Sequence, residues 1–540
     1  MNTNQKAVNE PIKSYEPGSN ERRTLQAKYD EIASEVIEIP LLIGGKEIKT
    51  EEQGKCVIPH DHQHVLGDFH MAGESEVQLA IDNSMETWNS WSKVTLEERT
   101  TIFRKAAELL QGPWRDTINA ATMLNQSKNA FQAEIDSACE LIDFFNFNCQ
   151  FAENIYNNQP LISPEGVKNS LEYRPLEGFV FAITPFNFTS IAGNLPCAPV
   201  LMGNVALWKP ASSAVLPCYY IMEMLKEAGL PDGVINFIPG SGSKVGDPVL
   251  TNPDLAGVHF TGSTQTFQHI WKTIGKNIDR YKTYPRIVGE TGGKDFCLAH
   301  ESVDISELAT AMIRGAFEFQ GQKCSAMSRA YIPSTIWDEL KDLYLSELKT
   351  VKIGSPRDFT NFMNAVIDKN AYDSIVEYID HAKISPDAEI LSGGSYDDET
   401  GYFIEPTTIL TSDPHFKTME EEIFGPVLTI FLYDPSDWEQ TIQLVDSTSP
   451  YALTGCVMGS DESAIKQAKD DLTHSAGNFY INDKPTGAVV GQQPFGGSRA
   501  SGTNDKAGSE LNLQRWISIR TVKETFDTPK NYRYPFLQED

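Results

Sequence analysis

Residues 257–274, GVHFTGSTQTFQHIWKTI, change from a short apolar run to a helical pattern through a turn at Thr261-Gly262-Ser263. This order predicts a strand that turns through glycine into a helix. The free backbone N–H groups and the dipole at such a helix N-terminus suit a pyrophosphate. We therefore expect Gly262, Ser263 and Thr264 to lie at a phosphate-binding turn.

The same alternation extends to both sides of this turn. Continuous apolar strands that alternate with helices predict a parallel sheet covered on both faces, as in dinucleotide-binding proteins. The apolar runs are 179–183, 205–208 and 234–238, and the helical patterns are 214–228 and 267–274. A second alternation runs from Arg286 to about Tyr480, so we predict two α/β domains.

The two ends of the chain differ from this pattern. Residues 1 to about 40 are polar and predict a poorly ordered arm and a surface helix without chemistry. The tail 516–526, WISIRTVKETF, reads as an isolated strand, and residues 167–173 offer a hairpin companion. A lone strand pair is marginally stable. We expect it to extend a sheet, across a subunit interface.

Composition excludes several classes of protein. The 540 residues carry 45 Lys and Arg against 74 Asp and Glu, a net charge of −29. Nucleic-acid and anionic-membrane partners require a basic surface, so neither is expected. No stretch approaches the roughly 20 apolar residues that span a bilayer. Eight cysteines without a CxxC pair, and an N-terminus without a targeting pattern, favour a reducing, cytoplasmic location.

Two residues stand out as candidates for covalent chemistry. Cys324 lies in GQKCSA among small polar neighbours, where the glycine turn and Lys323 favour a lowered thiol pKa; the alternative is an inert buried thiol. Glu290 lies in VGETGGK directly after an apolar strand. It can serve as a general base on water, or it can cap the following turn.

Three further segments are open to two interpretations each. Lys209, at the end of a predicted strand, binds ribose hydroxyls or a phosphate, or is simply solvated. The segment 240–246 is spaced GxGxxxG, which misses the usual dinucleotide fingerprint and favours ordinary loop glycines. His60, His62 and His64 alternate like three metal ligands on one strand face, but they follow Pro59 without a second shell. We predict a turn between strands there and no metal.

Four motifs in order identify a family resemblance: Phe260-Thr-Gly-Ser263, Glu290-Thr-Gly-Gly293, Gln322-Lys-Cys-Ser325 and Glu422-Ile-Phe-Gly-Pro426. Together they resemble the aldehyde dehydrogenase superfamily, from about Ile43 to Phe526. Residues 184–189, 259–267 and 486–502 most resemble the branch that oxidises L-glutamate γ-semialdehyde to L-glutamate in proline catabolism.

The resemblance implies an α/β fold with a Rossmann-type cofactor domain, an α/β catalytic domain and a small bridging β hairpin. The implied bounds are an arm and helix at 1–39, a cofactor domain at 40–160 and 176–288, a catalytic domain at 289–485, a hairpin at 161–175 and 508–540, and a substrate anchor loop at 486–507.

The resemblance also implies roles for single residues. Cys324 would attack the aldehyde carbon and form a thioester, the Asn187 amide would hold the oxyanion, and Glu290 would activate water. The cofactor NAD would be bound by Thr184, Lys209, Gly262, Ser263, Thr264, Glu422 and Phe424. The substrate would be held by Ser325 and the Gly487 and Ala488 N–H groups, between Phe188 and Phe495; ordinary loop and core packing is the alternative for these residues.

One departure from the family bears on the cofactor. Many NAD-preferring relatives have a glutamate shortly after the Lys-Pro dipeptide, but this chain reads Lys209-Pro-Ala-Ser-Ser213. We therefore expect NAD with some use of NADP. The implied partners are a second copy of the chain, as a homodimer or larger oligomer, and a functional link to proline dehydrogenase.

Three alternatives remain open at this point. The first is the oxidation of another short semialdehyde, such as succinic semialdehyde. The second is a non-catalytic binding protein on the same fold. The third is a cysteine hydrolase, whose histidine partner would come from the early histidine cluster.

Overall fold

The protein, described here over residues 6–539 of a computed structural model, is built around two seven-stranded sheets. The first sheet has the order β11-β10-β7-β8-β9-β2-β3. Strands β11 to β9 run parallel, and β2 and β3 are antiparallel to their neighbours. Its strands are β2 (Leu41–Ile43), β3 (Lys46–Ile48), β7 (Phe179–Ile183), β8 (Val205–Lys209), β9 (Ile235–Phe237), β10 (Leu255–Thr261) and β11 (Arg286–Glu290).

The helices of the first half surround this sheet, and α2 and α7 pack directly on its strands, which helps to bury β7 and β8 at almost every position. They are α1 (Asn20–Ala33), α2 (Glu74–Trp91), α3 (Leu96–Gln111), α4 (Arg115–Gln126), α5 (Ala130–Ala133), α6 (Glu140–Asn157), α7 (Thr189–Leu201), α8 (Val215–Glu227), α9 (Gly242–Leu250) and α10 (Thr264–Lys276). Between α5 and α6 lies a π-helical segment, η1 (Glu134–Cys139).

The second sheet has the order β14-β17-β18-β13-β12-β20-β21, parallel except for β14. Phe296 and Leu298 of β12 pack into one apolar cluster and Cys297 and Ala299 into another, so both faces are covered. The elements are β12 (Asp295–Ala299), β13 (Met327–Pro333), β14 (Ala388–Ser392), β17 (Thr407–Thr411), β18 (Val427–Tyr433), β20 (Thr454–Met458), β21 (Asn478–Ile481), α11 (Ile305–Phe317), α12 (Trp337–Leu348), α13 (Lys369–Ile384), α14 (Lys417–Glu420), α15 (Trp438–Ser447) and α16 (Glu462–Asp471).

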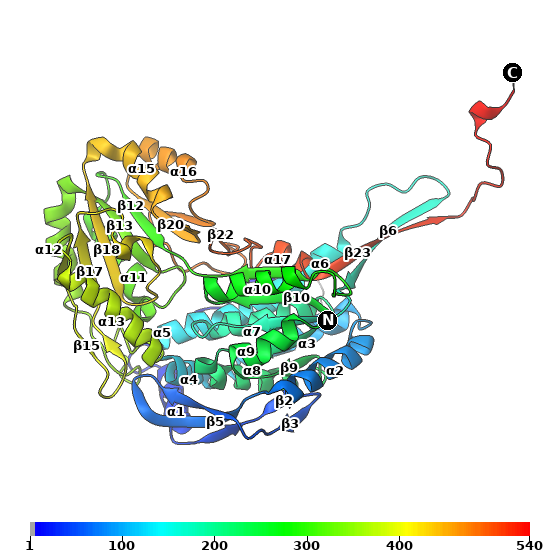
Figure 1. Cartoon of the computed structure of the whole chain (residues 1–540), viewed down its shortest axis with the longest axis horizontal. Helices are drawn as coiled ribbons and strands as arrows, with labels where there is room; N and C mark the ends of the chain where they lie inside the picture. Colours follow the sequence, from blue (N-terminus) through cyan, green and yellow to red (C-terminus); the bar gives the residue numbers. More distant parts are fainter. Residues whose placement is uncertain (1–5, 540) are drawn as a thin grey trace.

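Smaller elements surround the two sheets. They are β1 (Ile37–Ile39), β4 (Gln53–Ile58) and β5 (Asp61–His70) in one sheet, the pairs β15 (Tyr396–Asp397) with β16 (Phe403–Ile404) and β19 (Tyr451–Ala452) with β22 (Ser498–Arg499), and the helix α17 (Glu510–Gln514). Strands β6 (Val167–Pro175) and β23 (Ile517–Thr525) form an antiparallel ribbon. Figure 1 shows the ribbon projecting away from the two sheet domains, with the C-terminus beyond it.

The fold class and the main element predictions are confirmed. The strand-glycine-helix prediction corresponds to β10 and α10, and the tail strand pairs with the expected companion. The second alternation, however, does not begin at Arg286. Strand β11 is the edge strand of the first sheet and pairs with β10, so the second sheet begins at β12. The domain bounds themselves stay a prediction, and the 288/289 division falls inside β11.

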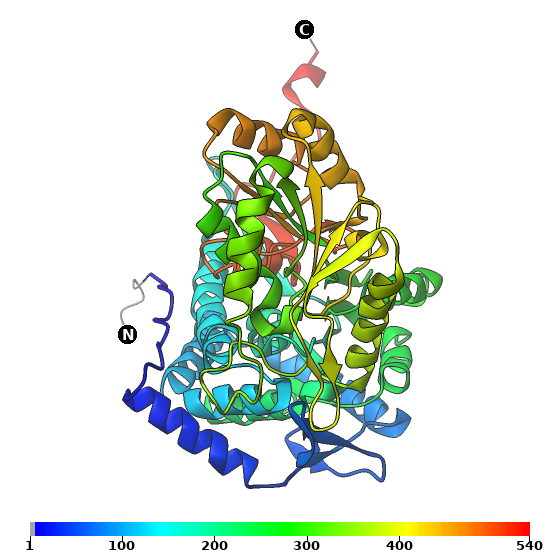
Figure 2. The ribbon, with the colours of Figure 1, turned by 90° about the vertical axis from the view of Figure 1, so that its left-hand side faces the viewer.

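The prediction of a poorly ordered arm is wrong for residues 7–15; residues 1–5 lie outside the described part of the chain. Tyr15 is buried and donates to Glu134 at 2.8 Å. Asn9 donates to Asp143 at 2.8 Å and to the Val490 carbonyl at 2.7 Å. The arm is held because its polar groups pair with buried groups, which composition does not reveal. Figure 2 shows α1, which follows the arm, along the lower edge of the molecule.

Across residues 6–539, every helix is too short or too polar to cross a membrane.

Candidate active site

The site forms where strands of the first sheet end and meet a loop of the second domain. Strand β7 ends at Ile183, and the loop before α7 carries Thr184, Asn187 and Phe188. Strand β11 places Glu290 beside Thr261 of β10, one residue before the predicted phosphate turn. Because parallel strands present their carboxyl ends at the same edge, residues distant in sequence meet here.

The nucleophile candidate contacts Glu290 directly, and its segment contacts Asn187. The Cys324 Sγ lies 3.4 Å from Oε1 of Glu290, in a geometry that lets the thiol donate a hydrogen bond to the carboxylate. The Asn187 side-chain amide donates to the Gln322 carbonyl at 3.0 Å. All three residues predicted to be catalytic therefore come together, from β11, the β7 loop and the segment after α11.

Two glycines explain how close the segments approach. A Cβ at Gly293 would lie 2.2 Å from the Cys324 carbonyl oxygen, and one at Gly292 would lie 2.1 Å from Oε2 of Glu422. At Gly293 the clash would be with backbone, which cannot yield, whereas at Gly292 it would displace the end of the Glu422 side chain. The two glycines after Glu290 therefore allow the nucleophile segment and the Glu422 loop to pack against this strand end.

The thiol of Cys324 is not a preformed thiolate. Its pKa is raised well above the ordinary value, first by burial and then by the charges of Glu290 and Asp295. The prediction that Lys323 lowers this pKa is wrong. The Lys323 ammonium lies 3.4 Å from Glu318 and 3.8 Å from Asp136, so its charge is used elsewhere in the interior.

The surroundings of the Glu290 carboxyl suit the predicted general base. Burial raises its pKa to about 7, while the hydrogen bond from Cys324 and the charge of Lys506 act in the opposite direction. Its strand is braced by a neighbouring segment, since Thr291 N donates to the Ser501 carbonyl at 3.0 Å and Thr503 N donates to the Gly289 carbonyl at 2.9 Å. A carboxyl with a pKa near 7 can take a proton from a thiol or a water and return it.

Five of the predicted cofactor residues follow or end strands of the first sheet, and Glu422 and Phe424 lie in a loop before β18 of the second. Thr184 accepts a hydrogen bond from Trp208 Nε1 at 3.0 Å, which ties the ends of β7 and β8 together. Ser263 caps α10 by accepting from Thr266 N at 3.3 Å, and Thr264 begins the helix. The expectation of ordinary loop glycines at 240–246 is confirmed for Gly240 and wrong for Gly242 and Gly246, which lie in α9 after its cap, Ser241.

The polar groups of Lys209 and Glu422 show whether the site fits a dinucleotide. Burial lowers the pKa of Lys209 to about 8, and within residues 6–539 the ammonium contacts only the Pro210 carbonyl, at 3.4 Å. Lys209 is therefore not the solvated lysine of the alternative interpretation. Glu422 accepts from Gly293 N at 2.9 Å through one oxygen, and burial raises its pKa to about 7. A buried cation at the end of β8 and a half-buried carboxylate in the loop before β18 fit the phosphates and ribose hydroxyls of NAD.

Phe424, also predicted to contact the cofactor, has a left-handed backbone with φ of 56°. Its ring packs edge-on against Phe186, with 5.7 Å between the ring centroids. The contact links the Glu422 loop to the loop after β7. The two predicted cofactor-binding loops are therefore held to each other.

The predicted substrate residues are placed on two sides. Ser325 Oγ lies 2.7 Å from Thr486 Oγ1, which joins the nucleophile segment to the start of the predicted anchor loop. Gly487 has φ of 103°, a conformation that glycine adopts readily, and Ala488 follows it. The Phe188 ring lies against the buried Lys128, and Phe495 pairs through its backbone with Ala507. That Phe188 and Phe495 enclose a substrate stays a prediction.

Sequence reasoning missed four residues near the site. Thr486 is the first residue of the predicted anchor loop but had no predicted role, and Asn9 lies in the arm that was assigned no chemistry. Lys294, in the Glu290 motif, is buried; burial and Arg329 lower its pKa to about 7, and its ammonium has no hydrogen-bond partner within the described chain. Lys128 has no local signal, because nothing around it in sequence distinguishes it from a solvated lysine.

The early histidines are occupied with other contacts. His60 bonds to Tyr29 and Ser127, each at 2.9 Å, His62 to the Asp398 carbonyl and His64 to the Ala33 carbonyl, both at 2.8 Å. Between residues 6 and 539 no group of three or more potential ligands is clustered for a metal ion. The turn between β4 and β5 holds only Pro59 and His60; the turn prediction is wrong for His62 and His64, which lie on β5. These histidines do not partner Cys324, which removes support for the cysteine hydrolase alternative.

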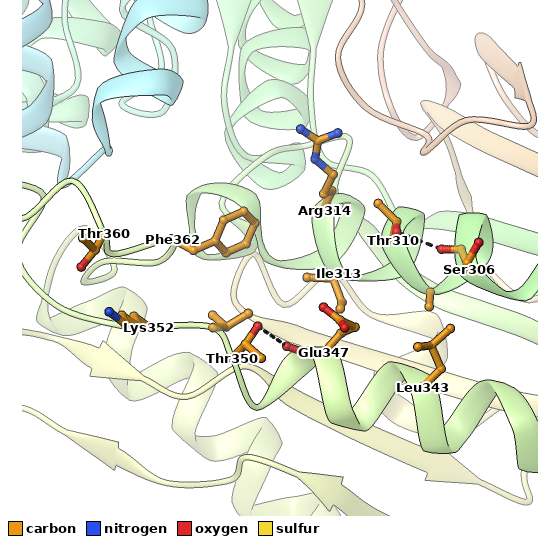
Figure 3. A pocket seen from close by; sticks show the side chains of 12 residues that line it. Ser306, Thr310, Ile313, Arg314, Leu343, Glu347, Thr350, Lys352, Thr360 and Phe362 are labelled. Carbon is orange, nitrogen blue, oxygen red and sulfur yellow. Dashed lines mark hydrogen bonds between the residues drawn. The ribbon is translucent and has the colours of Figure 1, made fainter. Parts of the chain in front are cut away.

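A groove of about 480 Å³ between α11 and α12 is a competing place to look for a ligand. Figure 3 shows that Thr310 and Thr350 on its walls direct their hydroxyls to backbone carbonyls, at 2.9 and 2.7 Å. Its Arg314 lies 3.6 Å from Glu318. The groove contains none of the predicted site residues, so we place the chemistry at Cys324.

Comparison with known proteins agrees with this location. The aldehyde dehydrogenase family model matches residues 47–522. The mitochondrial delta-1-pyrroline-5-carboxylate dehydrogenase of Dictyostelium discoideum is 53% identical over 532 residues, which cover 98% of this chain and 95% of that protein.

Solved structures give the same result. The delta-pyrroline-5-carboxylate dehydrogenase of Mycobacterium tuberculosis, crystallised with NAD, is 48% identical, with a TM-score of 0.96 and full coverage of both chains. Proline utilization A of Bdellovibrio bacteriovorus is 28% identical, with a TM-score of 0.92, and covers 96% of this chain and 53% of its own. The four sequence motifs, the contact between the Cys324 thiol and the Glu290 carboxylate, and these likenesses all indicate the same kind of enzyme.

Proposed function

The chain belongs to the aldehyde dehydrogenase family, and on that basis we propose that it oxidises L-glutamate γ-semialdehyde, formed from Δ1-pyrroline-5-carboxylate, to L-glutamate with NAD. The observation that carries the chemistry is the 3.4 Å contact between Cys324 Sγ and Glu290 Oε1. The observation that carries the substrate is the likeness to delta-1-pyrroline-5-carboxylate dehydrogenases over nearly the whole chain.

In the first half of the reaction Cys324 attacks the aldehyde carbon. Because burial raises the thiol pKa, the proton leaves during the attack and passes to Glu290, whose raised pKa of about 7 suits a temporary acceptor. The carbonyl oxygen becomes an oxyanion. The Asn187 amide donates one N–H to Gln322 and keeps its second N–H for that oxygen, together with the Cys324 backbone N–H.

NAD, when bound, supplies a nicotinamide that accepts the hydride released as the oxyanion collapses to the Cys324 thioester. Lys209, Thr184 and the α10 N-terminus would hold its adenosine half and phosphates, and Glu422 and Phe424 its nicotinamide ribose. Before the second half of the reaction Glu290 releases the thiol proton to solvent. It then takes a proton from water, and the oxygen of that water adds to the thioester carbonyl. The carbon–sulfur bond breaks, which releases glutamate, and the proton held by Glu290 restores the thiol.

Substrate selection follows from the groups around Cys324. The Gly487 and Ala488 N–H groups would bind the α-carboxylate of the substrate, and Ser325, fixed by Thr486, would donate beside it. Asn9 contributes to the loop position, because its amide group bonds to the Val490 carbonyl and accepts from Gln492 at 2.9 Å. Phe188 and Phe495 would cover the aliphatic chain and exclude water.

A steady-state comparison tests the proposal. Purified full-length protein is assayed with Δ1-pyrroline-5-carboxylate and with succinic semialdehyde, each with NAD and with NADP. We expect kcat/KM for the first substrate to exceed that for succinic semialdehyde by at least about 100-fold. The shorter succinic semialdehyde would leave the Gly487 and Ala488 N–H groups without a carboxylate partner when its aldehyde carbon lies at Cys324. Equal values would contradict the anchor-loop argument, and a strong NADP preference would contradict the cofactor assignment.

The variant Cys324→Ser separates catalysis from binding. It should abolish NADH formation while NAD still quenches tryptophan fluorescence. An enzyme that keeps its dehydrogenase activity without Cys324 would refute the thioester route. A chain that binds NAD but oxidises neither substrate in its wild-type form would revive the non-catalytic alternative.

We propose a homodimer or larger homo-oligomer. The β6–β23 ribbon projects from the body (Figure 1), and a two-stranded ribbon is marginal without a partner surface. A groove of about 910 Å³ at its base is lined by the exposed side chains of Trp271, Ile278 and Tyr284. Light scattering of the wild type and of a variant without residues 517–540 tests this, and a wild-type monomer would contradict it.

We propose a cytoplasmic enzyme with a functional link to proline dehydrogenase. Eight free, buried cysteines fit a reducing compartment. The name of the Dictyostelium relative places that protein in mitochondria. Fractionation of cells that express the untagged chain distinguishes the two compartments. The link to proline dehydrogenase would appear as faster glutamate formation from proline when both enzymes are present.

A further inference from the structure

One buried cation near the site has no part in the chemistry described above. Lys128 follows α4, directly after Ser127, which has φ of 57°. Its side chain is fully buried, and its ammonium lies 2.6 Å from Asp136 Oδ2 on the π-helical segment η1. Burying an ammonium is costly unless it is well compensated, and a hydrophobic residue of similar size would avoid that cost.

Asp136 supplies part of the compensation, and two aromatic rings supply more. The Lys128 ammonium lies 4.4 Å from the centroid of the Phe188 ring and 4.3 Å from that of the Phe319 ring. Such cation–π contacts are strongest where water is excluded. Phe188 directly follows Asn187 in the loop after β7, and Phe319 lies five residues before Cys324.

The segment that carries Phe319 needs external support. Phe319, Gln320 and Gly321 have φ values of 50°, 55° and 67°, and left-handed runs that contain two non-glycine residues are strained. The Gln320 amide donates to the Ser127 carbonyl at 3.1 Å. Ser127 and Lys128 thus hold two consecutive residues of the strained turn that leads to the nucleophile.

We propose that Lys128 is a positioning residue that clamps the Asn187–Phe188 loop of the first domain to the Phe319–Cys324 segment of the second, by placing its ammonium between the Phe188 and Phe319 rings. The clamp sets the Asn187 amide against the Cys324 thiol and holds Phe188 at the substrate. This inference rests on the proposed dehydrogenase function and adds to it a residue that touches neither substrate nor cofactor.

The experiment compares Lys128→Met, which removes the charge at similar length, with Lys128→Arg, which keeps a cation that stacks on aromatic rings. We expect Lys128→Met to lower kcat for Δ1-pyrroline-5-carboxylate about 30-fold, since a small misplacement of reacting groups has effects of this order. KM for NAD should change less than twofold. Lys128→Arg should recover kcat to within about fivefold of the wild type, a rescue that loss of fold stability alone would not produce.

The matched control is Tyr15→Phe, which removes a hydroxyl that donates to Glu134 on the same π-helical segment and contacts neither ring. It should leave kcat unchanged. Lys128→Met leaves the buried Asp136 carboxylate without its nearest cation, which destabilises the fold. The double variant Lys128→Met/Asp136→Asn removes the Lys128 charge without leaving that carboxylate unpaired. Phe319→Leu keeps both charges, removes one ring and should lower kcat at least fivefold.

The proposal is overturned if folded Lys128→Met or the double variant keeps kcat within twofold of the wild type, or if Phe319→Leu does. A change confined to KM for NAD would also overturn it. A wild-type enzyme that is inactive on Δ1-pyrroline-5-carboxylate refutes the proposed function instead, and the two failures are therefore distinguishable.

Discussion

Replacing Glu290 with glutamine should inactivate the enzyme and stabilise it at the same time. The interior raises the pKa of this carboxyl from its ordinary 4.5 to about 7. Between these values the unfolded chain releases a proton that the folded chain keeps, so folded-state stability falls as pH rises and levels off above about pH 7. A shift of this size corresponds to about 3 kcal/mol.

Glu290→Gln removes this penalty. Its stability should equal that of the wild type near pH 4.5 and exceed it by up to about 3 kcal/mol at pH 8, which for a chain of this length raises Tm by about 3 °C. In the wild type kcat should fall on the acid side, with a midpoint near pH 7, because the base must be ionised. The variant should lose about 10²- to 10⁴-fold in kcat, and the acid limb should disappear.

Thermal unfolding at pH 5 and pH 8 and a pH profile of kcat measure both effects. The exposed Glu377→Gln on α13 is the control and should change neither measurement. If the Tm difference between the variant and the wild type is the same at both pH values, the pKa of Glu290 is not raised by the folded protein. An acid limb that persists in the variant would assign that limb to another group.

Other variants test single contacts. Lys209→Met should raise KM for NAD about tenfold or more with kcat within about threefold, because a buried cation that binds substrate and transition state equally affects mainly KM; an unchanged KM would refute its cofactor role. Thr486→Val removes the hydroxyl 2.7 Å from Ser325 and should raise KM for the semialdehyde about fivefold, the worth of one hydrogen bond; an equal rise for NAD would argue against a substrate role. Arg115→Met leaves the buried Glu134 without its cation and should cost about 3–5 kcal/mol of stability. The more exposed pair of Arg104 and Glu153 gives the control, since Arg104→Met should cost less than about 1 kcal/mol, and equal losses in Tm would contradict the burial argument.

Much of the fold followed from local patterns. The apolar runs at 179–183 and 205–208 correspond to β7 and β8, and the capping box at Thr95 and Glu98 begins α3 as its sequence indicates. Arg286 was misassigned for a physical reason. An apolar strand has the same sequence pattern whether it is the last strand of one parallel sheet or the first of the next. Only the pairing of β11 with β10 assigns this strand to the first sheet.

The site was predicted less evenly. Cys324, Glu290 and Asn187 carry chemistry in recognisable motifs, and the structure brings them together. The direction of the Cys324 pKa shift was predicted wrongly, because Lys323 is adjacent to Cys324 in sequence but its ammonium does not lie beside the thiol. Lys323 points to Glu318 and Asp136, whereas the group beside the thiol is a carboxylate 34 residues away.

The amino-acid sequence by itself determined what depends on neighbours along the chain: the order of strands and helices, the helix caps, the glycine turns, and the residue types available for thioester chemistry. Tertiary structure alone decided what depends on burial and distant contacts. It set the pKa values of Glu290 and Cys324, tied the arm to the anchor loop through Asn9, and placed the Lys128 ammonium between two rings. The reason is that desolvation and Coulomb interactions act through space, and only the folded chain defines which groups share that space.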